Sequence, residues 1–135
     1  MTPLQTLQHH MAEAVAKHGK KDESGYGTCF QTALETIFYA KVPGAILCHA
    51  SCKLGDSPIA VAHGYVTYGD HIIDLDGTYN KAEWQEKAKP RHRHQYTRIE
   101  AGEKALKSGH YGPWANDLLA QQEEQHAIFN LIKGA

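Results

Sequence analysis

The stretch IAVAHGYVTYGDHIIDLD, at residues 59–76, predicts a β-hairpin. Two runs rich in β-branched and aromatic residues flank Gly69 and Asp70, and such a pair between two strand-like runs is typical of a two-residue turn. With that turn, Tyr68 faces His71 and the other pairs follow in step. The register of the two strands can therefore be predicted from the sequence.

The predicted register gathers polar side chains on one face of the hairpin. His63 is expected opposite Asp76, and Tyr65 opposite Asp74. A histidine and a carboxylate across two strands can hydrogen-bond, which fixes the imidazole tautomer and stabilises its protonated form. The His63 and Asp76 pair is thus a candidate oriented base. The opposite face is the better core candidate and carries Val66, Tyr68, Ile73 and Leu75.

The rest of the chain alternates helix and strand patterns. Apolar spacings of three and four predict a helix over 2–18, with Thr2 as N-cap, and a second helix from Thr28 to before Pro43. The remaining predictions are strands at 45–50 and 92–99, a short helix at 80–89, a helix followed by a loop over 102–114, and a helix over 115–135. We expect an α+β fold with N-terminal helices packed on a small antiparallel sheet and a C-terminal helix.

Composition limits the class of protein. The 135 residues suit one domain over residues 1–135, and the formal charge of -1 gives no overall field that attracts nucleic acid or an anionic membrane. No apolar run reaches the roughly 18 residues of a spanning helix, and the first ten residues lack the order of a signal peptide. We therefore expect a cytoplasmic protein with no membrane partner, whose three cysteines are thiols.

Cys29 is the best candidate nucleophile. Thr28 and Gln31 have the spacing of a capping box, which would place Cys29 at the first position of the second helix. The free N–H groups and the dipole at a helix start favour a thiolate. Glycines at 25 and 27 let a substrate backbone come close. Cys29 with a histidine and a carboxylate on one hairpin matches the requirements of thiol catalysis.

Several segments together resemble the transglutaminase-like branch of the papain-like cysteine enzymes. They are Gly27-Thr28-Cys29 before an apolar helix, Pro43-Gly44-Ala45 before a strand, His63-Gly64-Tyr65-Val66, and Ile73-Asp74-Leu75-Asp76-Gly77-Thr78. The resemblance covers about residues 25 to 80 and implies a catalytic triad of Cys29, His63 and Asp76. Gly64 and Tyr65 replace the family's common Ala-Trp pair, and Gly77 replaces a frequent Pro. The HYGPW stretch at 110–114 is similar to one in small phage and bacterial proteins of unassigned role.

The expected function is cysteine-dependent acyl transfer on an amide of a peptide or protein, as in a peptidase, an amidase, a glutamine deamidase or a transglutaminase, with hydrolysis favoured. The Cys29 N–H would donate to the oxyanion, and Tyr26 or Gln31 could be the second donor. Tyr65 and Asp74, which share the face of the predicted triad, are further candidate oxyanion or substrate residues. We expect no cofactor and no metal.

Other functions compete with this one. The fold could be a catalytically inactive module that binds a protein or a nucleic acid. Cys48, His49, Cys52, His92 and His94 could supply zinc ligands, although a strand turns Cys48 and His49 to opposite faces. The run of Arg and His at 91–94, with Tyr96 and Arg98, could contact phosphate, although alternation also makes an ordinary solvated strand face.

Overall fold

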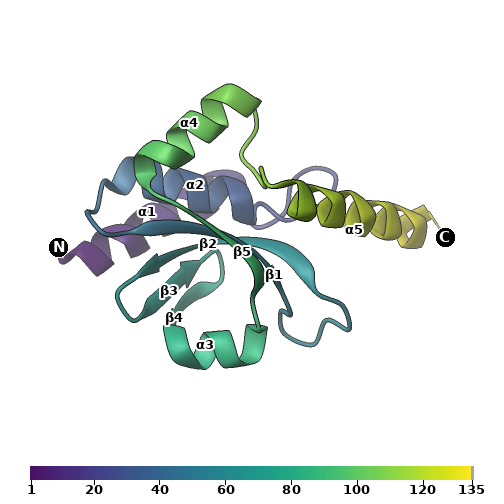
Figure 1. Cartoon of the computed structure of the whole chain (residues 1–135), viewed down its shortest axis with the longest axis horizontal. Coiled ribbons are helices and arrows are strands. Elements are labelled where there is room, and N and C mark those ends of the chain that lie inside the picture. Colours follow the sequence, from purple (N-terminus) through teal and green to yellow (C-terminus); the bar gives the residue numbers. More distant parts are fainter. Residues whose placement is uncertain (135) are drawn as a thin grey trace.

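A computed structural model of the chain describes residues 1–134. Its elements follow one another as α1 (Pro3–His18), α2 (Cys29–Ala40), β1 (Ile46–Cys52), β2 (Val61–Tyr68), β3 (His71–Asp74), β4 (Gly77–Asn80), α3 (Lys81–Ala88), β5 (Arg91–Tyr96), α4 (Arg98–Ser108) and α5 (Asn116–Gly134). The α+β expectation is confirmed: two N-terminal helices pack on a five-stranded antiparallel sheet, and a helix follows at the C-terminal end (Figure 1).

The sheet has the strand order β4-β3-β2-β1-β5, and every neighbouring pair is antiparallel. In the central hairpin Tyr68 pairs with His71 and Val66 pairs with Ile73, so the predicted register is confirmed. Strand β4 was not predicted. It pairs with β3 through a tight turn at Leu75 and Asp76, which changes where the second carboxylate of the hairpin lies.

Helices α1, α2 and α4 cover one face of the sheet, and α3 lies on the other (Figure 1). The first face forms the main core, where Val66 and Ile73 of the hairpin pack as expected. Its buried members are Leu7, Met11, Ala33, Leu34, Ile37, Ala45, Leu47, Val66, Ile73 and Ala101. The second face holds Tyr65 and Ile72 against Trp84 of α3, together with Cys48 and Cys52 of β1.

Helix starts and ends follow local sequence signals closely. Thr2 caps α1 with a complete capping box to Gln5, and the helix ends at Gly19 as predicted. Thr97 and Glu100 form a second complete box at the start of α4. Such caps satisfy N–H groups that a helix start leaves without partners, so these boundaries are set locally.

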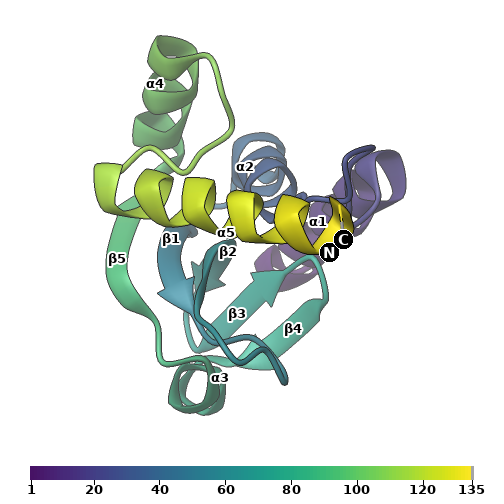
Figure 2. The same cartoon turned by 90° about the vertical axis from the view of Figure 1, so that its right-hand side faces the viewer.

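The C-terminal helix α5 crosses the end of the sheet beside β1 and β2 (Figure 2). Only Leu118 of this helix is fully buried within the described residues, and its last turns carry exposed Leu131 and Ile132. Two of its glutamine side chains hydrogen-bond to residues of β1 and β2 and to the segment before β2, as described below. No helix among residues 1–134 is long and apolar enough to cross a membrane.

Candidate functional site

The centre of the candidate site is a buried pair formed by His63 of β2 and Asp74 of β3. The His63 Nε2 lies 3.1 Å from the Asp74 Oδ2, and both side chains are only 5% exposed. The other oxygen of the carboxylate, Oδ1, accepts the backbone N–H groups of Asp76 at 2.8 Å and Gly77 at 3.1 Å. Asp74 therefore holds the β3–β4 turn with one oxygen and orients the imidazole with the other.

The predicted pairing of His63 with Asp76 is wrong, although the hairpin register that suggested it is right. Strand pairing between β2 and β3 ends at Val66 and Ile73, and Asp76 falls in the turn before β4. A side chain in this turn no longer faces β2. Asp76 instead is exposed and forms an ion pair with Lys20, with 3.0 Å between the Lys20 Nζ and the Asp76 Oδ1.

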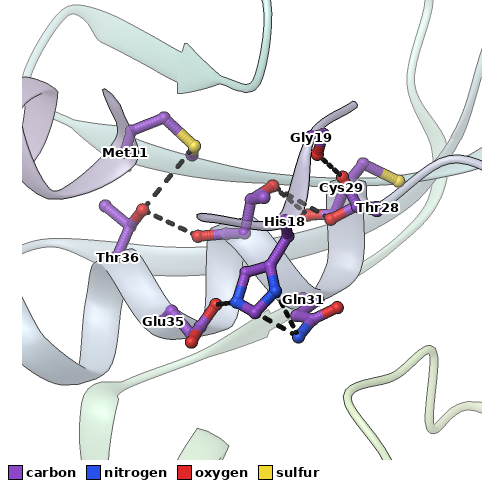
Figure 3. A network of polar contacts seen from close by, with 9 residues as sticks. Met11, His18, Gly19, Thr28, Cys29, Gln31, Glu35 and Thr36 are labelled. Atoms are coloured by element: carbon purple, nitrogen blue, oxygen red, sulfur yellow. Dashed lines mark hydrogen bonds and ion pairs between the residues drawn. The ribbon is translucent and has the colours of Figure 1, made fainter. Parts of the chain in front are cut away.

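Cys29 is the first residue of α2, as predicted, and it is buried, with 9% of its surface exposed. Thr28 is the N-cap, but the predicted capping box is absent because its hydroxyl donates to the Gly19 carbonyl at 2.6 Å. That bond ties the helix start to the end of α1 (Figure 3). The start of α2 is thus held in place by a tertiary contact, and the Thr28 side chain caps none of its free N–H groups.

Cys29 and His63 line the same cavity, and the thiol is close enough to contribute to the pKa shift of the imidazole. Since Nε2 of the imidazole faces Asp74, the second ring nitrogen, Nδ1, is the one available to sulfur. Burial is the largest single effect and lowers the pKa of His63, but the neighbouring Asp74 and Cys29 together outweigh burial and raise the pKa well above its ordinary value. An imidazole held in one orientation near a thiol at a helix start is the arrangement of a thiol nucleophile with its base.

Close packing of α2 on β2 makes this contact feasible. A Cβ built on Gly64 would lie 3.0 Å from the Phe30 Cδ1, 3.1 Å from the Phe30 Cα and 3.3 Å from the Cys29 carbonyl oxygen. Any larger residue would push the helix start away from the strand. Gly64, which departs from the Ala of the resembled family, is therefore required by this particular packing.

A cavity of about 320 Å³ opens directly onto Cys29 and His63. Its walls come from five parts of the chain: the α1–α2 loop, the start of α2, the segment around β2, the β3–β4 turn and α5. The lining residues are Lys20, Lys21, Gly27, Cys29, Phe30, Leu54, Val61, Ala62, His63, Leu75, Asp76, Gln122, Gln125 and His126. The thiol, the imidazole and an open cavity thus meet at one place.

The residues predicted as oxyanion or substrate groups lie elsewhere. The Gln31 amide contacts the His18 ring, which also pairs with Glu35, on the side of α2 turned away from the Cys29 sulfur (Figure 3). The Tyr26 hydroxyl donates to the Asn130 Oδ1 at 2.9 Å, and its ring stacks on His126. Gln31 and Tyr26 are therefore occupied in structural contacts.

Tyr65 has a supporting position rather than a place in the cavity. It is 1% exposed and packs against Trp84, with the His63 ring stacked at a centroid distance of 5.9 Å. The Trp84 ring also stacks on His63, at 6.3 Å. These aromatic neighbours limit the rotation of the imidazole and keep water from its buried side.

The other cysteines and the basic strand have different surroundings. Burial raises the pKa of the Cys48 thiol and raises that of Cys52 to about 12, which disfavours their thiolates. Within residues 1–134 no group of three or more His, Cys, Asp or Glu side chains is arranged to hold a metal ion. On β5, the His94 Nε2 lies 3.1 Å from the Asp117 Oδ1, so an acidic residue lies against the run of Arg and His at 91–94.

Sequence analysis missed the contribution of α5 to the cavity. Gln122 and His126 stand four residues apart on the stripe of this helix that faces the protein, and Gln125 lies beside them. The signal for this contribution was the presence of polar Gln122 and His126 among the apolar residues on the inward side of the helix. The signal does not say which strand the helix crosses, so the site could not be assigned from it.

The fold and this site define a small α+β protein with a buried Cys-His-Asp constellation. Comparisons with protein families, with curated proteins and with solved structures found no match to the chain.

Proposed function

We propose that the protein is a cysteine-dependent acyltransferase or hydrolase acting on an amide of a peptide or protein, with a triad of Cys29, His63 and Asp74. One observation carries the proposal: the buried His63, oriented by Asp74, lines the same cavity as the Cys29 thiol at the start of α2. Nucleophile, base and orienting carboxylate in this order are the elements of thiol catalysis.

The resemblance of residues 25–80 to transglutaminase-like and papain-like enzymes supports the same proposal and extends it to a papain-like arrangement of the fold. In this chain, as in the enzymes that it resembles, a cysteine begins a helix that packs on an antiparallel sheet, and the histidine comes from a strand. The triad carboxylate is Asp74 rather than the Asp76 that the resemblance implies. The proposal does not depend on Asp76, because the orienting contact is present in the structure.

In the proposed reaction, the Cys29 thiolate attacks the amide carbonyl carbon and the carbonyl π electrons move to oxygen. The His63 imidazolium then gives its proton to the leaving nitrogen, and the C–N bond breaks to leave a thioester. Water attacks the thioester with neutral His63 as base, which releases the acid and restores the thiol. Asp74 keeps the ring oriented and stabilises its charge throughout.

Alkylation with iodoacetamide at pH 6.5, followed by mass spectrometry of the peptides, tests this proposal. Cys29 is expected to react at least about 10²-fold faster than Cys48 or Cys52, because only Cys29 has an acid–base partner and faces a cavity. A Cys29→Ser variant should lose the fast phase and leave the slow phases unchanged.

Equal, slow alkylation of all three cysteines would contradict the proposal. That result would favour the catalytically inactive binding module, because such a module has no need of a reactive thiol. Urea added to the same samples should make all three cysteines react alike, which checks that the difference comes from the folded structure.

A further inference from the structure

Helix α5 is attached to the sheet next to the catalytic candidates by two glutamines. The Gln121 Nε2 donates to the Ser51 Oγ at 2.8 Å and to the Ala60 carbonyl at 3.1 Å. One helical turn further along α5, the Gln125 Oε1 accepts the backbone N–H of Ala62 at 3.0 Å. Gln125 lines the cavity of Cys29, whereas Gln121 does not.

The hydrogen bond from Ala62 determines which way the Gln125 amide points. A backbone N–H can pair only with the carbonyl oxygen of a carboxamide, so the NH₂ end must be turned away from Ala62. No hydrogen bond from this NH₂ group to another residue within 1–134 is present. The Gln125 side chain is thus held in the wall of the cavity by Ala62, the residue before His63. Its NH₂ group remains available as a hydrogen-bond donor.

The proposed reaction needs such a donor. When the thiolate adds to a carbonyl, negative charge develops on oxygen, and hydrogen-bond donors already in place stabilise it. The backbone N–H of Cys29, in the first turn of α2, is one donor because helix starts leave their N–H groups without helical partners. Tyr26 and Gln31 cannot be the second, because other contacts hold them.

We propose that the Gln125 side-chain NH₂ is the second oxyanion donor, so that the C-terminal helix completes the active site. The inference rests on the proposed function of Cys29 and His63. It predicts that Gln125 matters only for reactions that pass through an oxyanion. Alkylation by iodoacetamide is a direct displacement of iodide at a saturated carbon, and no oxyanion forms in it.

The test compares two reagents on the full chain. With p-nitrophenyl acetate, the Cys29 sulfur adds to the ester carbonyl, the tetrahedral oxyanion collapses, and p-nitrophenolate leaves as the thioester forms. The released p-nitrophenolate gives the acylation rate. Iodoacetamide gives the alkylation rate of the same thiol. The ratio of the two rates isolates the effect on the oxyanion.

Three variants separate the donor from a structural tether. Gln125→Ala removes both the acceptor and the donor, whereas Gln125→Glu keeps an oxygen for the Ala62 N–H and loses the NH₂ donor. Gln121→Ala is the matched control because it loosens the same helix without changing the cavity wall. Thermal unfolding of each variant checks that α5 remains docked.

Both Gln125 variants are expected to lower the ratio of acylation to alkylation about 10²-fold, while Gln121→Ala leaves it unchanged. A ratio that stays at the wild-type value in Gln125→Ala and Gln125→Glu would overturn the donor role and leave the proposed function intact. A wild-type Cys29 that reacts with neither reagent would overturn the proposed function and the donor role with it. A ratio lowered equally by Gln121→Ala would show that helix docking, and not the donor, is responsible.

Discussion

Two histidines on neighbouring strands are both buried and yet have opposite surroundings. His49 of β1 pairs with Gly64, and His63 of β2 pairs with Ala50, so the two histidines are one step apart in the sheet. Because side chains alternate along a strand, they lie on opposite faces. The consecutive residues that begin α2 lie near one histidine each: Cys29 lines the same cavity as His63, and the Phe30 ring packs against His49 with 4.8 Å between the ring centroids.

The pKa values of the two histidines move in opposite directions. His63 has a carboxylate and a thiol, which raise its pKa despite burial. His49 sits among the rings of Phe30, Tyr96 and Trp114, and neither ring nitrogen has a hydrogen-bond partner among the described residues. Burial, with smaller effects from neighbouring histidines, lowers its pKa to about 3. The partner, and not burial alone, decides whether a buried histidine can act as a base.

The largest expected effect comes from removing one histidine or the other. His63→Ala should slow the acylation of Cys29 by p-nitrophenyl acetate about 10³-fold, because the base and its charge are lost. His49→Leu should change the rate little, since its ring contacts neither the thiol nor the cavity. Stopped-flow release of p-nitrophenolate measures both. If the acylation rate depended on His49 more than on His63, the base would be His49, on the other face of the sheet, and the assignment of His63 would be wrong.

Asp74→Asn against Asp76→Asn tests which carboxylate orients His63. An Asn oxygen can still accept the N–H groups of Asp76 and Gly77, so Asp74→Asn should keep the turn but place a neutral NH₂ donor, instead of a charged acceptor, opposite the His63 Nε2. We expect about a 10²-fold slower acylation, whereas Asp76→Asn loses only an exposed ion pair and should stay near wild type. The opposite ranking would restore Asp76 as the orienting group.

Gly64→Ala tests the close contact between α2 and β2 that lies between the two histidines. The added methyl would meet Phe30 and the Cys29 carbonyl, and overpacking of this kind costs about 1–3 kcal/mol in the free energy of unfolding. Acylation of Cys29 should slow as well, because the helix start moves. Gly102→Ala in α4 is the control, since its Cβ would be 3.7 Å from the nearest atom and alanine favours a helix. Equal stability of the two variants in urea unfolding would refute the contact.

The smallest predicted effect is a dependence of stability on pH. An unfolded histidine takes a proton near pH 6.5, whereas folded His49 stays neutral down to about pH 3. Below pH 6.5 the unfolded state therefore binds more protons, and the free energy of unfolding falls as the pH is lowered. Between pH 7 and pH 5 the loss due to His49 is roughly 2 kcal/mol.

The opposite sign holds for His63, which separates the two groups. Its folded pKa is raised, so its contribution is fully present below pH 6.5 and is lost as the pH rises through that folded value. Urea unfolding at pH 7 and pH 5 should accordingly show a smaller acid loss in His49→Leu than in wild type. Identical losses in the two proteins would show that His49 is not the group that titrates.

Much of the fold could be predicted from the sequence because its signals are local. Apolar spacing and the Thr2 cap set α1, and Gly69-Asp70 set the register that the sheet shows. Strand β4 was missed because four residues with one partner strand carry little pattern of their own. The turn before it decided the site, since it moved Asp76 out of line with His63.

The sequence by itself determined the nucleophile candidate and the base candidate, because a helix start and a strand face follow from local periodicity. Only the tertiary structure decided the carboxylate, the cavity and the place of α5. Asp74 reaches His63 because pairing stops where the chain turns, and Gln125 reaches Ala62 across a separation of 63 residues. Contacts between elements that are distant in the chain depend on how helices and strands pack, and no residue spacing records that.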